Sequence, residues 1–207
     1  MQSQLGLGSY RTAWMLCAKL RRAMVDPERE PLSGVVEADE TIILFRTKND
    51  PIVVPAGRSG VGKMLVAGAA EVDGGSPRGV RLKVTEGFSK GEIHAFVLAA
   101  VAPSTRLVTD DWPSYSNIPD IKHKAITVGP MAAHIVLPWA HRLFSNLKRW
   151  GLGVYHGLRK TNLQHYLDEF VFRFNRRRTR HAAFNTLLGI GARTAPAPYH
   201  LLIRKTA

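Results

Sequence analysis

The sequence predicts an α/β protein in which a mixed sheet of five strands is flanked by helices, with a short helical segment at the amino terminus. Three observations lead to this fold class. Runs of β-branched residues separated by Gly-rich turns fill the first half of the chain, and helical spacing of apolar residues dominates the second half. The composition, with 45% hydrophobic and 22% charged residues in 207, is that of a folded protein with a sizeable core.

Residues 9–24 have the pattern of an amphipathic helix. Ser9 is a suitable N-cap. Apolar residues then follow at intervals of three or four, at Tyr10, Ala13, Trp14, Cys17, Leu20 and Met24. A charged, Pro-containing linker over residues 25–33 ends this segment. We therefore expect one helix ahead of the sheet.

Three strands are expected next, over residues 35–45, 64–72 and 80–84. The first is rich in β-branched residues, and Gly-rich segments at 57–62 and 73–79 separate the three. Short turns between consecutive strands predict an antiparallel meander.

A helix and a short strand follow the meander. Residues 89–100 have helical spacing, and Ser89 with Glu92 three residues later forms a capping box. Residues 106–109 form a short apolar strand that leads directly into Asp110. The chain therefore returns to the sheet after one helix.

The second half of the chain completes the fold. Residues 121–128 are the candidate fifth strand, and residues 139–149 and 161–177 have the pattern of two helices. A Pro- and Ala-rich tail over residues 181–207 has no clear element. Strands and helices in this order are typical of the ribonuclease-H-like fold.

Positive charge is concentrated in the second half. The chain has 29 Lys+Arg and 16 Asp+Glu, a formal net charge of +13, so a polyanion is the leading class of partner. Between residues 142 and 180, ten basic residues accompany two acids. Aromatic residues alternate with them, at Trp150, Tyr155, Tyr166, Phe170, Phe172 and Phe174. A solvated helix face is the alternative, but this alternation favours helices that bury one face and bind phosphates with the other.

The composition also excludes several classes of protein. No apolar run approaches the roughly 18 residues of a membrane-spanning helix, and the first residues lack a secretory signal pattern. Cys17 is the only cysteine, which excludes an internal disulfide and a Cys-rich zinc site. A reducing compartment such as the cytoplasm fits this cysteine usage.

Acidic residues occur at two points where a ribonuclease-H-like sheet brings strands together. Alternation along the first strand sends Glu37 and Asp39 to one face and Glu40 to the other. Asp110 and Asp111 follow the fourth strand. For the acids of the first strand, the alternative is an exposed edge strand with solvated carboxylates. For Asp110 and Asp111, the alternative is that Asp is common wherever a strand ends. In that topology the middle of the first strand lies beside the end of the fourth, so Asp39 and Asp110 can share a metal ion.

A third group lies on the helix predicted over residues 139–149. Seven residues separate His141 from Lys148, which is about two turns and places both on one face roughly 10 Å apart. One of these two side chains can bind a metal ion and the other a phosphate. A capping or packing histidine is the alternative.

The segment GRSGVGK at residues 57–63 matches most of a phosphate-binding loop. However, Met64 stands where the Mg²⁺-binding Ser or Thr is needed, and a strand rather than a helix is expected to follow. We interpret this segment as a mobile basic hairpin turn and not as a nucleotide site.

Taken together, these motifs resemble the DDE-type insertion-sequence transposases with an ISXO2-like catalytic domain. The similar stretches are VVEADET at 35–41, GRSGVGKMLVAGAAE at 57–71, RLVTDDWPSY at 106–115, LPWAHRLFSNLKRWGLGVYHG at 137–157 and LQHYLDEFVFRFNRRR at 163–178. They span nearly the whole chain. The last two are the most specific, because a basic helix, a Gly-rich turn and an aromatic Arg-rich helix in this order rarely arise by chance.

The resemblance implies a set of site residues. The two catalytic aspartates fall on Asp39 and Asp110, the third catalytic position on His141, and the characteristic lysine after it on Lys148. The third position is commonly Glu or Asn in the family, so His141 is a departure. The expected cofactor is Mg²⁺, with two ions held by Asp39, Asp110 and His141 and with Mn²⁺ as a substitute.

The resemblance also implies DNA as the partner, both transposon ends and target, bound by a homodimer or higher assembly. The expected DNA-binding residues are Lys148, Arg149, Arg159, Lys160, Arg173, Arg176, Arg177 and Arg178. A bacterial, nucleoid-associated location in the cytoplasm follows from this partner. The alternative is a catalytically inactive, truncated remnant that only binds DNA.

The resemblance suggests three parts of the chain. Residues 1–33 are expected to be the end of a helix-turn-helix region with a linker, residues 34–180 the catalytic domain, and residues 181–207 a tail. A zinc-binding region expected upstream is missing, so we expect a shortened copy.

Overall fold

A computed structural model of the protein describes residues 2–44, 63–127, 133–155 and 158–203. The chain forms two compact units, residues 30–160 and residues 1–29 together with 161–207. These units are groups of residues in mutual contact and do not by themselves define domains. The domain boundaries at 33/34 and 180/181 therefore stay a prediction.

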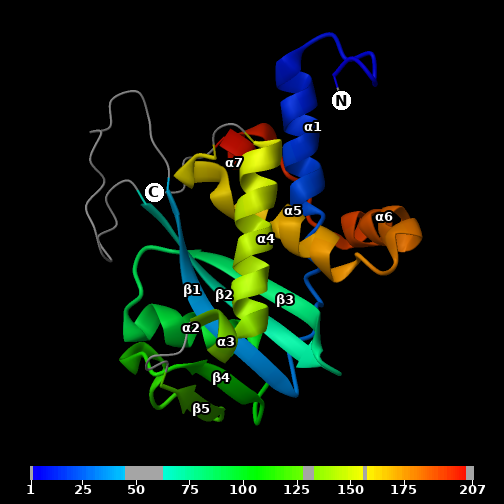
Figure 1. Ribbon diagram of the computed structural model, residues 1–207. Coiled ribbons are helices and arrows are strands. Elements are labelled where there is room, and N and C mark those ends of the chain that lie inside the picture. Colours follow the sequence, from blue (N-terminus) through cyan, green and yellow to red (C-terminus); the bar gives the residue numbers. More distant parts are fainter. Residues whose placement is uncertain (1, 45–62, 128–132, 156–157, 204–207) are drawn as a thin grey trace. The chain divides into compact units, whose positions relative to one another are not determined.

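Residues 30–160 are built around a mixed five-stranded sheet in the order β3-β2-β1-β4-β5 (Figure 1). The strands are β1 Val35–Leu44, β2 Lys63–Asp73, β3 Ser76–Thr85, β4 Arg106–Asp110 and β5 Lys122–Ile126. The first three form the predicted antiparallel meander, while β4 runs parallel to both β1 and β5. This topology confirms the ribonuclease-H-like fold class.

Helix α2 (Lys90–Ala100) begins at the predicted cap. The Ser89 hydroxyl oxygen accepts the Glu92 N–H at 3.4 Å and donates to Glu92 Oε2 at 3.2 Å. The other oxygen, Glu92 Oε1, accepts the backbone N–H groups of Glu86 and Gly87, both at 3.1 Å. The Glu92 carboxylate therefore fixes the turn from β3 into the helix as well as the helix start.

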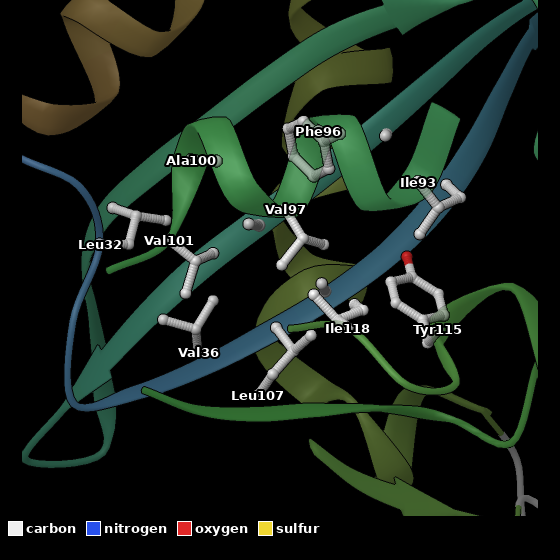
Figure 2. Close-up of a cluster of buried hydrophobic side chains, with 13 residues drawn as sticks. Leu32, Val36, Ile93, Phe96, Val97, Ala100, Val101, Leu107, Tyr115 and Ile118 are labelled. Atoms are coloured by element: carbon white, nitrogen blue, oxygen red, sulfur yellow. The ribbon is translucent and has the colours of Figure 1, made fainter. Parts of the chain in front are cut away.

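An apolar core packs α2 against one face of the sheet, as Figure 2 shows. Its buried residues are Leu32, Val36, Ala38, Ala67, Ala69, Ile93, Phe96, Val97, Ala100, Val101, Leu107, Tyr115 and Ile118. Val36 and Ala38 alternate with the acids of β1, so the even-numbered positions of this strand face α2.

Helix α4 (Pro138–Val154) packs on the sheet against β1 and β2. The short helix α3 (Ala133–Val136) precedes it. Gly68 of β2 makes this packing close, because a Cβ atom at this position would lie 2.5 Å from Cε1 of the Phe144 ring. The buried side of the helix consists of Ala140, Leu143, Phe144, Leu147 and Gly151.

The second unit contains α1 (Tyr10–Arg22) and α5 (Leu163–Asn175). Helix α1 begins as predicted, with the Ser9 side chain accepting the Thr12 N–H at 3.1 Å. The buried Glu169 of α5 pairs through Oε2 with Nε of Arg21 at 2.8 Å. A buried carboxylate needs such partners, so this ion pair links the two helices.

Two helices occupy the segment for which the sequence indicated no element. These are α6 (Ala183–Arg193) and α7 (Tyr199–Ile203). The Gly residues at 189 and 191 weaken the helical propensity of α6, so the sequence pattern did not predict this helix. Burial of Ile190, which is 1% exposed, stabilises the helix by tertiary packing.

Candidate functional site

Strand β1 presents acids to both sides of the sheet, as its alternation predicts. Glu37 contacts the start of α4, and Asp39 faces His141 on the same helix. Ala38, between them, belongs to the core under α2. Because Glu40 shares that even register, it lies on the face opposite Asp39.

Glu37 caps helix α4 from the sheet. Its Oε2 atom accepts the backbone N–H of Trp139 at 2.7 Å and of Ala140 at 2.9 Å, and the residue is 8% exposed. The N-cap residue Leu137 provides no side-chain acceptor. Burial raises the pKa of Glu37, while the Ala140 and Trp139 N–H groups oppose the increase. A carboxylate from another element therefore satisfies donors that the helix leaves unpaired.

This cap positions the next residue of α4 against Asp39. Nε2 of His141 lies 3.6 Å from Oδ2 of Asp39, and the two side chains are 34% and 14% exposed. The other oxygen, Asp39 Oδ1, accepts the Glu40 N–H at 2.8 Å. The imidazole therefore faces the carboxylate, as a role in the site requires.

The fourth strand brings Asp110 toward the same place. The parallel register of β1 and β4 runs from Val35 opposite Arg106 to Glu37 opposite Val108. Two further steps along both strands lead to Asp39 and Asp110. The Oδ1 atom of Asp110 accepts the Trp112 N–H at 3.3 Å, which directs the turn after the strand.

The buried Tyr115 lies within electrostatic reach of the acids of both strands. Its side chain is fully buried, and burial raises its pKa well above the usual value, with further increases from Glu40, Asp39 and Asp110. Figure 2 shows its hydroxyl group directed toward β1. Sequence reasoning missed this residue, although it ends the RLVTDDWPSY motif. It also missed the capping role of Glu37, for which an acid two residues before Asp39 was the available signal.

The carboxylates of Asp39 and Asp110 suit a hard divalent cation better than the imidazole of His141 does, and the three side chains do not form one cluster. Among the described residues, no three His, Cys, Asp or Glu side chains lie close enough to hold one metal ion. Nε2 of His141 and Oδ2 of Asp39 face each other at 3.6 Å, a separation that matches neither adjacent octahedral ligands at roughly 3 Å nor opposite ones at about 4.2 Å. An ion held by both would need a small movement of these side chains.

The second aspartate of the fourth-strand turn points elsewhere. Asp111 is exposed, and its Oδ2 accepts the Thr127 hydroxyl at 3.3 Å. Burial lowers the pKa of His123, and the charge of Asp111 opposes part of this decrease. Asp110, which precedes it, is only partly exposed.

Lys148 lies on the same helix as His141. Both Lys148 and its neighbour Arg149 are exposed, while Leu147 beside them is buried. Seven residues on one helix correspond to about 10 Å. The structure therefore places the lysine two turns beyond the histidine, with its ammonium group accessible to a ligand.

Four of the six remaining predicted cations are either paired with an acid or exposed. Lys160 and Arg173 have acidic partners, Glu86 at 2.5 Å and Glu169 at 2.9 Å. Arg159 and Arg178 are exposed. A phosphate can bind the paired side chains by replacing or sharing a carboxylate.

Stacking on phenyl rings orients two further arginines. The Arg176 guanidinium lies 4.1 Å from the centre of the Phe172 ring. That of Arg177 lies 4.2 Å from the centre of the Phe174 ring. Both residues are partly buried, so their rings hold the cations close to the body of the helix.

Most of the loop-like GRSGVGK segment lies outside the described residues. Its last residue, Lys63, begins β2, so a strand and not a helix follows it, as expected. No helix among the described parts of the chain is long and apolar enough to cross a membrane.

Comparison with known proteins gives one family match. The model of the ISXO2-like transposase domain matches residues 31–175. This match begins just before β1 and ends with the last residue of α5. No curated protein matches the chain significantly.

Several solved structures are similar at low identity. The HTLV-2 integrase catalytic core domain in complex with magnesium is 15% identical, covering 70% of this chain and 87% of that one, with a TM-score of 0.42. A pre-cleavage Mos1 transpososome is 13% identical over 88% of this chain and 64% of that one (TM-score 0.44). For a simian T-cell lymphotropic virus intasome the identity is 13% and the TM-score 0.44, and this chain spans 49% of that one.

Proposed function

The chain belongs to the family of ISXO2-like transposase domains, and from that premise we propose that it cuts and joins transposon-end DNA by two successive phosphoryl transfers. Asp39, Asp110 and His141 would hold two Mg²⁺ ions, for which Mn²⁺ could substitute. The observation that carries the proposal is the approach of His141 Nε2 to Asp39 Oδ2 at 3.6 Å. The sequence separates these residues by about a hundred positions, and the cap on α4 brings them together.

Divalent ions supply the activation of water or a 3′-hydroxyl and the neutralisation of charge on the phosphoryl group. The chain itself orients the ligands. Glu37 holds the first turn of α4 and thereby the direction of His141. Asp39 is held through its second oxygen by the Glu40 N–H. Lys148 would hold the terminal DNA phosphate or a base edge beside the metal ions.

The DNA backbone binds the basic residues of both units. They are Lys148, Arg149, Arg159, Lys160, Arg173, Arg176, Arg177 and Arg178. Clustered Arg without an Asn or Gln pairing pattern suits contact with phosphates, which positions DNA without reading its sequence. Joining two transposon ends to a target requires a homodimer or higher assembly on DNA. We place the catalytic domain at residues 34–180 and the protein in the bacterial cytoplasm with the nucleoid.

A cleavage and strand-transfer assay on DNA that carries the transposon ends tests the proposal. Asp39→Asn and Asp110→Asn should abolish Mg²⁺-dependent cleavage and leave DNA binding nearly intact. The matched control is Asp111→Asn, because this neighbouring carboxylate is exposed and pairs with Thr127. Equal loss in all three variants, or metal-independent cleavage by the wild-type protein, would contradict the proposal. DNA binding without any cleavage would favour the inactive remnant.

A further inference from the structure

A hollow lined by arginines lies where α5 ends and α6 begins. Its volume is about 420 Å³. Its lining residues are Phe172, Arg173, Arg176, Arg177, Arg180 and Ala183. Four of these six residues carry a positive charge and none is acidic. All six come from one short stretch of chain within one compact unit.

The turn between the helices shapes this hollow. Helix α5 ends at Asn175, and the next residues turn through a Thr179 N–H bond to the Arg176 carbonyl at 3.0 Å. A 3₁₀ turn over Arg180–Ala182 then leads into α6. Because the chain reverses here, side chains before and after the turn line one concave surface.

Two of the arginines are oriented before any ligand arrives. Arg176 stacks on the Phe172 ring, and Arg177 stacks on the Phe174 ring. Arg177 also donates through Nη1 to the Phe174 carbonyl at 2.9 Å. Side chains held in this way lose little conformational entropy when they bind a ligand.

The third arginine, Arg173, is anchored by an ion pair. The acids near the hollow are shared with other arginines, so they neutralise only part of its positive charge. Nη2 of Arg173 lies 2.9 Å from Oε1 of Glu169, whose other oxygen binds Arg21. One Glu169 carboxylate is therefore shared between two guanidinium groups. The negative charge of Asp26 favours the charged form of Arg176, but Asp26 is itself paired with Arg193.

We propose that the hollow binds two successive phosphates of one nucleic-acid strand. This inference rests on the proposed function for the identity of the ligand as DNA, and it adds Arg180 to the predicted DNA-binding residues. Four guanidinium groups exceed what a single phosphate needs, whereas two phosphates can each be bound by two of them. The planar fork of Arg matches phosphate oxygens in a bidentate manner. Arg173 lies in the last turn of α5, Arg176 and Arg177 follow its end, and Arg180 begins the 3₁₀ turn, so the turn brings all four to one hollow.

Fluorescence anisotropy of a labelled single-stranded oligonucleotide tests this site in the full chain, with a chelator present so that catalysis plays no part. Arg176→Gln and Arg180→Gln should each weaken binding about 5- to 10-fold at about 0.1 M salt, the effect of one phosphate contact. Arg78→Gln on β3 removes an exposed cation far along the chain from the hollow and is the charge-matched control. Arg178→Gln, in the same turn but outside the lining, should weaken binding less than Arg180→Gln.

Small competitors identify the ligand. A trinucleotide, which has two phosphates, should displace the labelled strand at concentrations at least about tenfold lower than a dinucleotide with one. Competition by inorganic phosphate as strong as that of the trinucleotide would overturn the proposal in favour of a single-anion site. Equally weakened binding in Arg180→Gln, Arg178→Gln and Arg78→Gln would overturn it in favour of diffuse charge. Because no step needs metal, these results are independent of whether cleavage occurs.

Discussion

At the scale of single residues, His141 distinguishes this site from one built only of carboxylates. An imidazole is a neutral and softer ligand than a carboxylate, so the proposed ligand set has one negative charge fewer than a set of three carboxylates. Its ring nevertheless faces Asp39 and remains one third exposed, a position that permits both metal and DNA to approach. The histidine is therefore the residue whose substitution reports most directly on the proposed mechanism.

His141→Ala should lower the rate of Mg²⁺-dependent cleavage by a large factor without lowering the melting temperature. His141→Glu should retain or restore activity with Mg²⁺, because a carboxylate is the harder ligand. Mn²⁺ should support the wild-type protein at least as well as Mg²⁺, because it accepts imidazole nitrogen more readily. Cleavage rates in both metals measure these effects. Full activity of His141→Ala would remove the histidine from the ligand set.

Asp168 is a residue whose charge opposes folding. Burial raises its pKa to about 6, although Gln164 Nε2 donates to Oδ1 at 2.9 Å and Arg29 favours the charged form. The unfolded chain therefore releases this proton near pH 4 and the folded chain near pH 6. Between these values the folded state holds more protons, so stability falls as pH rises.

Asp168→Asn should remove this decrease in stability. Above about pH 6 we expect the variant to be about 3 kcal/mol more stable to unfolding than the wild type, and below about pH 4 equally stable. Urea unfolding at several pH values measures the difference. Asp73→Asn, which removes an exposed aspartate at the end of β2, is the matched control for the loss of one carboxylate. A wild-type stability that rises across this window relative to Asp168→Asn would contradict the assignment.

At the scale of elements, the docking of α4 on the sheet decides the geometry of the site. Two features set this docking: the Glu37 cap at the first turn and the close fit of Phe144 over Gly68 further along the helix. Gly68 is the register neighbour of Asp39 across β1 and β2. A change in the helix position at Gly68 would therefore alter the distance between Asp39 and His141.

Gly68→Ala should destabilise the protein by about 1 to 3 kcal/mol, because its Cβ would overlap the Phe144 ring. The cost should shrink in a Phe144→Leu background, where the ring is absent. Gly153→Ala is the matched control, since nothing lies near a Cβ at this position of α4. It should be neutral or stabilising, as Ala favours helix over Gly. Thermal unfolding measures these effects, and equal effects at both glycines would contradict the packing argument.

At the scale of the whole molecule, the net charge of +13 sets a long-range attraction for polyanions. The cations that produce it are not equivalent. Lys160 and Arg173 have carboxylate partners, while Arg176 and Arg177 are stacked on rings. DNA binding should therefore depend steeply on salt but unequally on individual side chains.

Replacing Arg176, Arg177 and Arg178 together by Gln should weaken binding to all DNA sequences alike. It should also flatten the slope of log K against log salt by about one unit for each phosphate that the variant no longer binds. Binding isotherms at several salt concentrations measure the slope. An unchanged slope would indicate that these three arginines form a solvated helix face and do not bind phosphates.

Local sequence patterns were sufficient to predict most of the helices and strands. Alternation in β1, the Ser9 and Ser89 caps and the glycines between strands predicted where elements begin and end, because these signals depend on neighbours in sequence. The α6 helix escaped prediction because its stability comes from the burial of Ile190 and not from its own propensities.

For the site, residue types and spacing identified Asp39, Asp110, His141 and Lys148 as candidates, since chemistry selects carboxylate, imidazole and ammonium groups wherever they stand. Their geometry depends on contacts between distant segments. Glu37 holds α4, the register of β1 and β4 leads Asp39 toward Asp110, and the turn after α5 gathers four arginines into one hollow. Such convergence follows from packing and hydrogen bonds across the fold, which no local pattern along a chain contains.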